Sequence, residues 1–149
     1  MSEPLLVHAT AVAIDAHAVL LRGSPGAGKS DLGLRLIDAG AVLIADDQCE
    51  LRRAGSVIVV RAPATIAGLL EVRNVGILRV DTLPEAPLAL IADLVAREGL
   101  ERVPEPRVEM VLGIAVPSIA LAPFEVSASA KLRLALRAIR GHGAGFAEL

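Results

Sequence analysis

The eight residues from Gly23 to Ser30, G-S-P-G-A-G-K-S, constrain this chain more than any other stretch. They match the pattern G-x-x-x-x-G-K-S at every fixed position, with an apolar run before them and a helical pattern after them. In that context, small residues let backbone N–H groups turn inward around phosphate oxygens, and the helix start adds the positive end of its dipole. We therefore predict a P-loop, against the alternative of a glycine-rich turn with a chance lysine.

The loop also predicts which side chains meet a nucleotide. Lys29 is expected to bring a mobile cation to the β and γ phosphates, and Ser30 to offer its hydroxyl to Mg²⁺. ATP and Mg²⁺ are the expected cofactors. The residues predicted to surround the phosphates are Gly23, Ser24, Pro25, Gly26, Ala27, Gly28, Lys29 and Ser30.

Two carboxylates, Asp46 and Asp47, close the apolar run A-V-L-I-A-D-D. A strand, a loop, a helix and a second strand parallel to the first place both strand ends at the same edge of a sheet, where ligands bind. One aspartate is then free to hold Mg²⁺ through water, and the other to accept a proton from an attacking hydroxyl. The alternative is that one of them only caps the next turn.

Composition excludes several classes of protein. The 149 residues are 54% hydrophobic with a net charge of −2, which predicts one folded domain and no general affinity for nucleic acid. Two phenylalanines without tryptophan or tyrosine argue against the stacking platforms that bind nucleic-acid strands. No apolar stretch is long enough to span a membrane, and the start lacks a basic region typical of signal peptides. The lone Cys49 fits a reducing compartment, so we expect a cytoplasmic protein with a semi-buried, structural thiol.

The pattern of apolar residues predicts an α/β fold. Residues 5–22 and 50–63 are expected to form hairpins, 41–47 a buried strand, and 69–81 and 108–123 extended segments. Residues 30–40 and 127–143 are expected to be helices ending at Gly40 and Gly141. Residues 88–98 fit either a helix or a strand. In the last helix Arg133, Arg137 and Arg140 form one face, either solvated or a docking surface for an acidic partner or another subunit.

Several motifs together resemble those of the bacterial HPr kinase/phosphorylase family. The segment G-S-P-G-A-G-K-S-D-L-G-L-R-L-I-D-A-G-A-V-L-I-A-D-D is similar to the family's phosphate loop, helix and V-A-D-D strand. A-G-L-L-E-V-R-N-V-G-I-L-R-V, residues 67–80, resembles the signature R-G-L-L-E-V-R-G-x-G-I-I-x-V, which ordinary P-loop proteins lack. L-L-V-H-A-T-A-V-A-I resembles the H-G-V-x-V stretch, and L-E-R-V-P-E-P weakly resembles the D-R-L segment.

The resemblance implies a P-loop kinase domain of the HPr kinase and PEP carboxykinase-like type, with a mixed sheet, hairpins and flanking helices. It implies a serine kinase acting on HPr, the phosphocarrier of the sugar phosphotransferase system, and a reverse phosphorolysis that releases pyrophosphate. Asp47 would exchange the proton and Asp46 would support it, while His8 would help hold their geometry. Glu71 would be a metal ligand beside Ser30, and Arg102 an active-site arginine.

The similarity covers almost the whole chain but only the family's catalytic half. We therefore expect one catalytic domain over residues 1–149 without the N-terminal regulatory domain, as in a short alphaproteobacterial form, and a hexamer like other family members. One departure is large: the loop P-V-R-P-G-R-N is replaced by L-A-P-F-E-V-S-A-S-A-K-L-R-L-A-L. Because that loop matters especially for dephosphorylation, the resemblance supports the kinase reaction more strongly than its reversal.

Two other functions remain open from the sequence alone. One is a small-molecule P-loop kinase, although no separate lid segment is evident. The other is a nucleotide-binding regulatory module that transfers no phosphate. Oligomeric state, effector and choice of HPr-like partner are not encoded in any motif.

Overall fold

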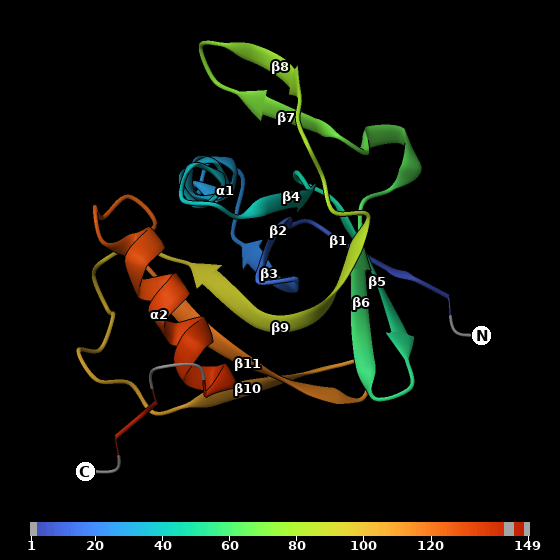
Figure 1. The fold of residues 1–149 in the computed structure, drawn as a ribbon. Coiled ribbons are helices and arrows are strands. Elements are labelled where there is room, and N and C mark those ends of the chain that lie inside the picture. Colours follow the sequence, from blue (N-terminus) through green and yellow to red (C-terminus); the bar gives the residue numbers. More distant parts are fainter. Residues whose placement is uncertain (1–2, 142–144, 148–149) are drawn as a thin grey trace.

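The computed structural model describes residues 3–141 and 145–147 (Figure 1). Nine strands form one curled sheet, with the order β1-β5-β6-β9-β3-β2-β4 along one path and the β11–β10 pair attached to β9. Strands β7 and β8 pair separately. The strands are β1 Leu5–Val7, β2 Thr10–Ile14, β3 His17–Arg22, β4 Val42–Ala45, β5 Cys49–Ala54, β6 Val57–Arg61, β7 Leu69–Val72, β8 Gly76–Arg79, β9 Glu85–Leu94, β10 Arg107–Val111 and β11 Ile114–Leu121.

The two α-helices lie where the sequence predicts them, although residues 142 and 143 of the second predicted helix lie outside the described residues, and a short 3₁₀ helix was not predicted. The helices are α1 Lys29–Asp38, the short 3₁₀ helix η1 Ala64–Ile66, and α2 Ala128–Arg140. Gly40, with φ 109°, follows the end of α1, and its N–H donates to the carbonyl of Ile37. Gly141, at φ 72°, caps α2. In the described part of the chain, no helix has the length and apolar character needed to cross a membrane.

The first predicted hairpin forms from β2 and β3, which pair antiparallel up to Ile14 and His17. The prediction was wrong for its first residues, because β1 pairs with β5 and not with this hairpin. Asp15 and Ala16 make its two-residue turn, with φ values of 50° and 63°. Positive φ at both central positions is the geometry that matches the twist of a two-residue hairpin. The other predicted hairpin forms from β5 and β6.

Strand β9 resolves the ambiguity of residues 88–98: residues 88–94 are strand, and residues 95–98 belong to the loop after it. Its first residues pair antiparallel with β6, and from Leu88 onward it pairs parallel with β3 and then with β11. Figure 1 shows it as a long curved strand through the middle of the molecule. Both faces of β9 are covered, so most of its residues are apolar. The apolar positions therefore follow neither the two-residue repeat of a half-exposed strand nor the repeat of an amphipathic helix.

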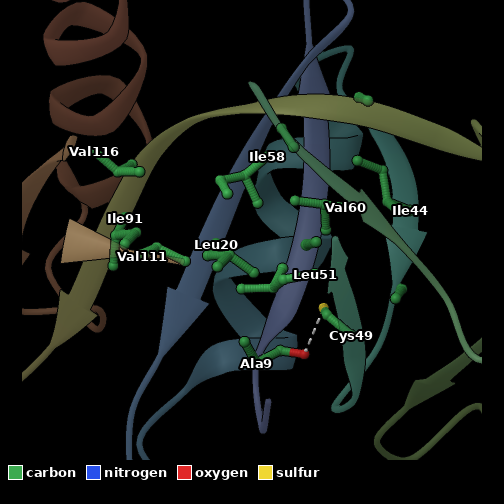
Figure 2. Packing of buried hydrophobic residues seen from close by; sticks show 14 of the residues in the cluster. Ala9, Leu20, Ile44, Cys49, Leu51, Ile58, Val60, Ile91, Val111 and Val116 are labelled. Atoms are coloured by element: carbon green, nitrogen blue, oxygen red, sulfur yellow. Dashed lines mark hydrogen bonds between the residues drawn. The ribbon is translucent and has the colours of Figure 1, made fainter. Parts of the chain in front are cut away.

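Two hydrophobic clusters lie on opposite faces of the central strands. On β3, Ala18 and Leu20 join the cluster toward β5 and β6, whereas Val19 and Leu21 join the cluster under α1 and α2. Figure 2 shows the first cluster, in which Leu20, Leu51 and Val60 lie together. The molecule is therefore layered, with helices on one face of the β9-β3-β2-β4 region and the curled β5–β6 part of the sheet on the other.

Helix α2 buries the apolar stripe that the sequence predicts. Leu132 and Leu136 are buried in the cluster that also contains Leu32 and Leu36 of α1. On the second face of α2, Arg137 and Arg140 are exposed. With Arg133 they line a cavity of about 150 Å³ beside the end of α1.

Candidate functional site

Four strands end at the same edge of the sheet. Strand β9 is parallel to both β3 and β11, and β3 and β4 are each antiparallel to β2, so all four run in one direction. The phosphate loop follows β3, the two aspartates follow β4, and the loops after β9 and β11 begin beside them. The sequence predicts β3 and β4 parallel, and they are, with β2 between them. This shared edge is the candidate active site.

The phosphate loop is packed tightly at its beginning. A Cβ on Gly23 would lie 2.7 Å from the Cβ of Ala27 and 3.3 Å from the carbonyl oxygen of Leu94, so glycine is required there. Gly28 ends the loop at φ 99° and precedes the first turn of α1. A helix start with free N–H groups is a ready anion site.

Lys29 folds back into this loop and is 8% exposed. Its Nζ donates to the carbonyl oxygens of Gly23, at 2.9 Å, and Ser24, at 3.2 Å. No carboxylate in the described residues forms an ion pair with it. Its positive charge is therefore held by neutral carbonyl groups and available to a phosphate.

Asp46 connects three elements around the end of the loop. Its Oδ1 accepts from the Oγ of Ser30 at 2.7 Å and from the Oγ1 of Thr10 at 3.2 Å. Its Oδ2 accepts from the backbone N–H of Glu71 at 3.3 Å. The carboxylate is thereby fixed beside the hydroxyl that ends the phosphate loop.

Asp47 is exposed and has an unusual backbone, with φ 68°. Its N–H donates to the Oγ1 of Thr10 at 3.3 Å, and its carbonyl accepts from the N–H of Ala9 at 3.2 Å. Left-handed geometry is costly for most residues and less so for aspartate, and such strain is found at functional sites. The two backbone bonds hold Asp47 so that its side chain reaches solvent.

The remaining predicted residues lie at different places. His8 is exposed at the bend between β1 and β2, next to Ala9. Glu71 is on β7, with its backbone at Asp46 and its side chain exposed. Arg102 is exposed in the loop between β9 and β10, and no described hydrogen bond or ion pair joins it to the other predicted residues.

The oxygen atoms at the end of the phosphate loop are suitable ligands for Mg²⁺. Magnesium is usually held by one or two carboxylates together with substrate phosphates and water. Ser30 and Asp46 provide a hydroxyl and a carboxylate in contact, with Glu71 next along the hairpin. Within the described ranges, no three His, Cys, Asp or Glu residues are grouped so as to bind a metal by themselves. This pattern fits an ion carried in with a nucleotide.

Thr10 is a site residue that sequence reasoning missed. It is fully buried on β2, and its hydroxyl donates to Asp46 while accepting from the N–H of Asp47. The available signal was a polar residue in the otherwise apolar run Ala9–Ile14. Its function depends on β2 lying between β3 and β4, which no local pattern predicts.

Cys49 lies below the same edge and is fully buried. Its Sγ donates to the carbonyl oxygen of Ala9, as the dashed line in Figure 2 shows. Burial, with a smaller contribution from Asp46 and Asp47, raises the pKa of this thiol to about 12. A neutral, enclosed thiol is a structural group, and it is buried more completely than the semi-buried thiol that the sequence predicts.

Comparison with known proteins agrees with this geometry. The sequence profile of the HPr Serine kinase C-terminal domain matches residues 1–86, which is more than half of the chain and includes the loop, Asp46, Asp47 and Glu71. The chain belongs to the HPr serine kinase family. This confirms the family recognised from the motifs.

Individual relatives support the same assignment. The chain is 39% identical over 117 residues to an HPr kinase/phosphorylase of Leptothrix cholodnii, covering 70% of this chain and 36% of that protein. It is 35% identical over 131 residues to one of Polaromonas naphthalenivorans, covering 79% and 42%. The chain thus spans roughly two fifths of the length of these relatives.

A solved structure confirms the expected fold. The Hpr(Ser) kinase/phosphatase from Coxiella burnetii superposes with a TM-score of 0.77 at 28% sequence identity, covering 93% of this chain and 90% of that one. The mixed α/β architecture with hairpins and flanking helices is therefore that of an HPr kinase, a P-loop-type kinase domain.

Proposed function

We propose that this chain is a serine kinase domain that transfers the γ-phosphoryl group of ATP to a serine of an HPr-like phosphocarrier protein. The observation that carries the proposal is the arrangement of Ser30, Asp46 and Asp47. The hydroxyl ending the phosphate loop donates to the first aspartate, and the second is exposed beside it. Residues 1–149 would act as one catalytic domain.

Each group has a role that follows from its position. Lys29 and the loop N–H groups would offset the charge on the phosphates, which is most of the catalysis in phosphoryl transfer. The serine oxygen of the partner bonds to the γ-phosphorus as the bond to the bridging oxygen breaks, leaving ADP. Asp47 would take the hydroxyl proton of that serine. His8 would support Asp47 through the adjoining Ala9, whose N–H holds the Asp47 carbonyl.

Magnesium bound with ATP would neutralise charge on the phosphate oxygens. Ser30 and Asp46 would hold it, with Glu71 as the further carboxylate. The reaction belongs where ATP and phosphocarriers are found, which we take to be the cytoplasm. A homo-oligomer, hexameric by family resemblance, is part of the proposal.

The kinase direction is favoured over phosphorolysis by the loop between β11 and α2. Phe124 of this loop lies against Gly28 of the phosphate loop, where the family's P-V-R-P-G-R-N loop would supply two arginines. Its one charged residue, Glu125, accepts from Lys131 and pairs with Arg97 at 3.8 Å. The loop therefore adds no cation of its own to hold a second phosphate anion.

Labelled ATP and the Asp47→Asn variant test the proposal. We expect wild-type protein to label serine on a purified HPr-like protein. Asp47→Asn should lower the transfer rate about 10²- to 10⁴-fold, the usual contribution of a general base, while the Kd for ATP changes little. The matched control is Asp38→Asn, an exposed aspartate at the far end of α1.

The same assay separates the alternatives. Label on a metabolite in place of the protein would indicate a small-molecule kinase. Tight ATP binding without any transfer would indicate a regulatory module. Addition of phosphate to the phosphorylated partner, with analysis for pyrophosphate, measures the reverse reaction.

A further inference from the structure

Phe124 is an exposed aromatic ring placed against the phosphate loop. Its side chain lies in the loop between β11 and α2 and the residue is 70% exposed, although the chain contains only two phenylalanines and no other aromatic residue. A Cβ at Gly28 would lie 3.0 Å from the ring carbon Cζ and 3.3 Å from the Cβ of Pro123. One part of the ring therefore meets the loop backbone, and the rest is open to solvent.

A cavity of about 1080 Å³ opens beside this ring. It begins at the phosphate loop itself, because Ser24 and Ala27 form part of its wall. Its other walls come from the end of β9 and from the loop that follows β11. Among the lining residues are Leu94, Val95, Pro123, Phe124 and Val126.

We propose that this cavity receives the nucleoside of the bound nucleotide, with Phe124 stacking on the base. This proposal rests on the proposed function, since the phosphates must occupy the loop for the base to lie next to it. A base offers a π-face to an aromatic ring, and stacking is independent of its hydrogen-bonding pattern. The cavity is of ligand size and mixes apolar walls with a few polar groups, as nucleoside pockets do.

Charge and connectivity favour this occupant over a side chain of the protein partner. The cavity adjoins the same loop whose Lys29 and helix start attract the phosphates, so one ligand spans both. Arg97 and Glu125 at its wall pair with each other at 3.8 Å and provide polar groups for a ribose. A single ring is enough for one base, whereas nucleic-acid strands require several.

Calorimetric titration with two ligands tests the proposal. ATP and inorganic triphosphate, each with Mg²⁺, are titrated into wild-type protein, Phe124→Ala, Phe124→Leu and Phe124→Tyr. We expect Phe124→Ala and Phe124→Leu to weaken ATP about tenfold, the effect of losing one stacked base, and to leave triphosphate unchanged within about twofold. Phe124→Tyr should keep wild-type affinity. Phe146→Ala, which removes the other exposed phenylalanine, is the matched control.

The outcomes distinguish this inference from the proposed function. Unchanged ATP affinity in Phe124→Ala, or full affinity in Phe124→Leu, would overturn stacking while leaving the kinase intact. Equal weakening of ATP and triphosphate would show that Phe124 only supports the loop, and would also overturn it. Failure of wild-type protein to bind either ligand would overturn the proposed function and this inference together.

Discussion

At the scale of single residues, the site depends on one hydroxyl that carries two hydrogen bonds. Thr10 donates to Asp46 and accepts from the N–H of Asp47, so it fixes the carboxylate of Asp46 and the backbone of Asp47 relative to β2. It touches neither nucleotide nor partner in the proposed reaction. Thr10 is therefore a positioning residue, and we expect it to affect catalysis only by holding Asp47 in place.

Thr10→Val tests this position because valine keeps the shape and removes the hydroxyl. Loss of a buried partner should lower the free energy of unfolding by about 1–3 kcal/mol. With Asp47 less well held, kcat for transfer should fall while KM for ATP changes little. Steady-state kinetics and chemical denaturation measure both effects.

Thr10→Ser is the control, since it restores the hydroxyl and should restore kcat. If Thr10→Val keeps full kcat, or if it changes KM alone, Thr10 does not position the base. Stability alone would not separate these cases, because any core threonine contributes to folding.

At the scale of elements, the β7–β8 hairpin is the part least embedded in the fold. It forms its own two-stranded sheet, and Figure 1 shows it projecting beyond α1 and β4. Val75 and Ile77 are 69% and 71% exposed, whereas Leu70 is only 2% exposed. The buried side chain of Leu70 and the hydrogen bond from the N–H of Glu71 to Asp46 both attach the hairpin to the body of the domain.

Leu70→Ala should loosen the hairpin specifically. Removing a buried leucine side chain costs about 2–5 kcal/mol, and here the loss should fall on the opening of the hairpin. We expect amide hydrogen exchange to accelerate in residues 69–79 and to stay slow in β3. Transfer activity should also fall, because Asp46 loses the N–H of Glu71.

Ile77→Ala is the matched control, as Ile77 lies on the same hairpin but is 71% exposed and is not the cross-strand partner of Leu70. It should leave exchange nearly unchanged. Equal acceleration across the whole chain in Leu70→Ala would mean that the hairpin unfolds only with the domain, contrary to this prediction.

At the scale of the whole molecule, one ion-pair network joins three strands beneath the phosphate loop. Arg22, the last residue of β3, donates through Nε to Asp93 of β9 at 2.8 Å and through Nη1 to Glu109 of β10 at 2.6 Å. Hydrogen bonds from Arg22 lower the pKa of Glu109 below its ordinary value of 4.5. The network therefore holds the start of the loop to the far hairpin.

The pH dependence of stability follows from that pKa. Because the folded pKa of Glu109 is depressed, its contribution is present above about pH 4.5 and is lost as the pH falls through the folded value. Wild-type protein should exceed Glu109→Gln in free energy of unfolding by about 0.5–1 kcal/mol at neutral pH, a small value because the pair is partly exposed. The difference should shrink on acidification.

Denaturation curves of both proteins at a series of pH values measure this difference directly. Glu105→Gln, which changes an exposed glutamate in the preceding loop outside the Arg22 network, is the matched control. A difference that grows as the pH falls would contradict the assigned direction of the Glu109 pKa.

Local patterns in the sequence determined the parts of this protein whose physics is local. The sequence Gly23–Ser30 predicts a phosphate loop because all the groups that bind phosphate lie within eight residues. These groups are the inward-facing N–H groups, the start of a helix and a lysine. The strand ends place Asp46 and Asp47 at the same edge because parallel strands end together. Family motifs added Glu71 and His8 to the predicted site.

Only the tertiary structure decided which of these groups touch. The Ser30–Asp46 bond, the Thr10 bridge and the approach of Phe124 to Gly28 join residues that are 16 to 96 positions apart, and no short pattern encodes such contacts. The secondary structure of residues 88–98 was also decided only by the tertiary fold. Residues 88–94 are apolar because both faces of β9 are covered, and an apolar run of this kind fits a helix as well as a strand. Pairing with β3 and β11 makes them a strand, whereas residues 95–98 lie in the loop that follows.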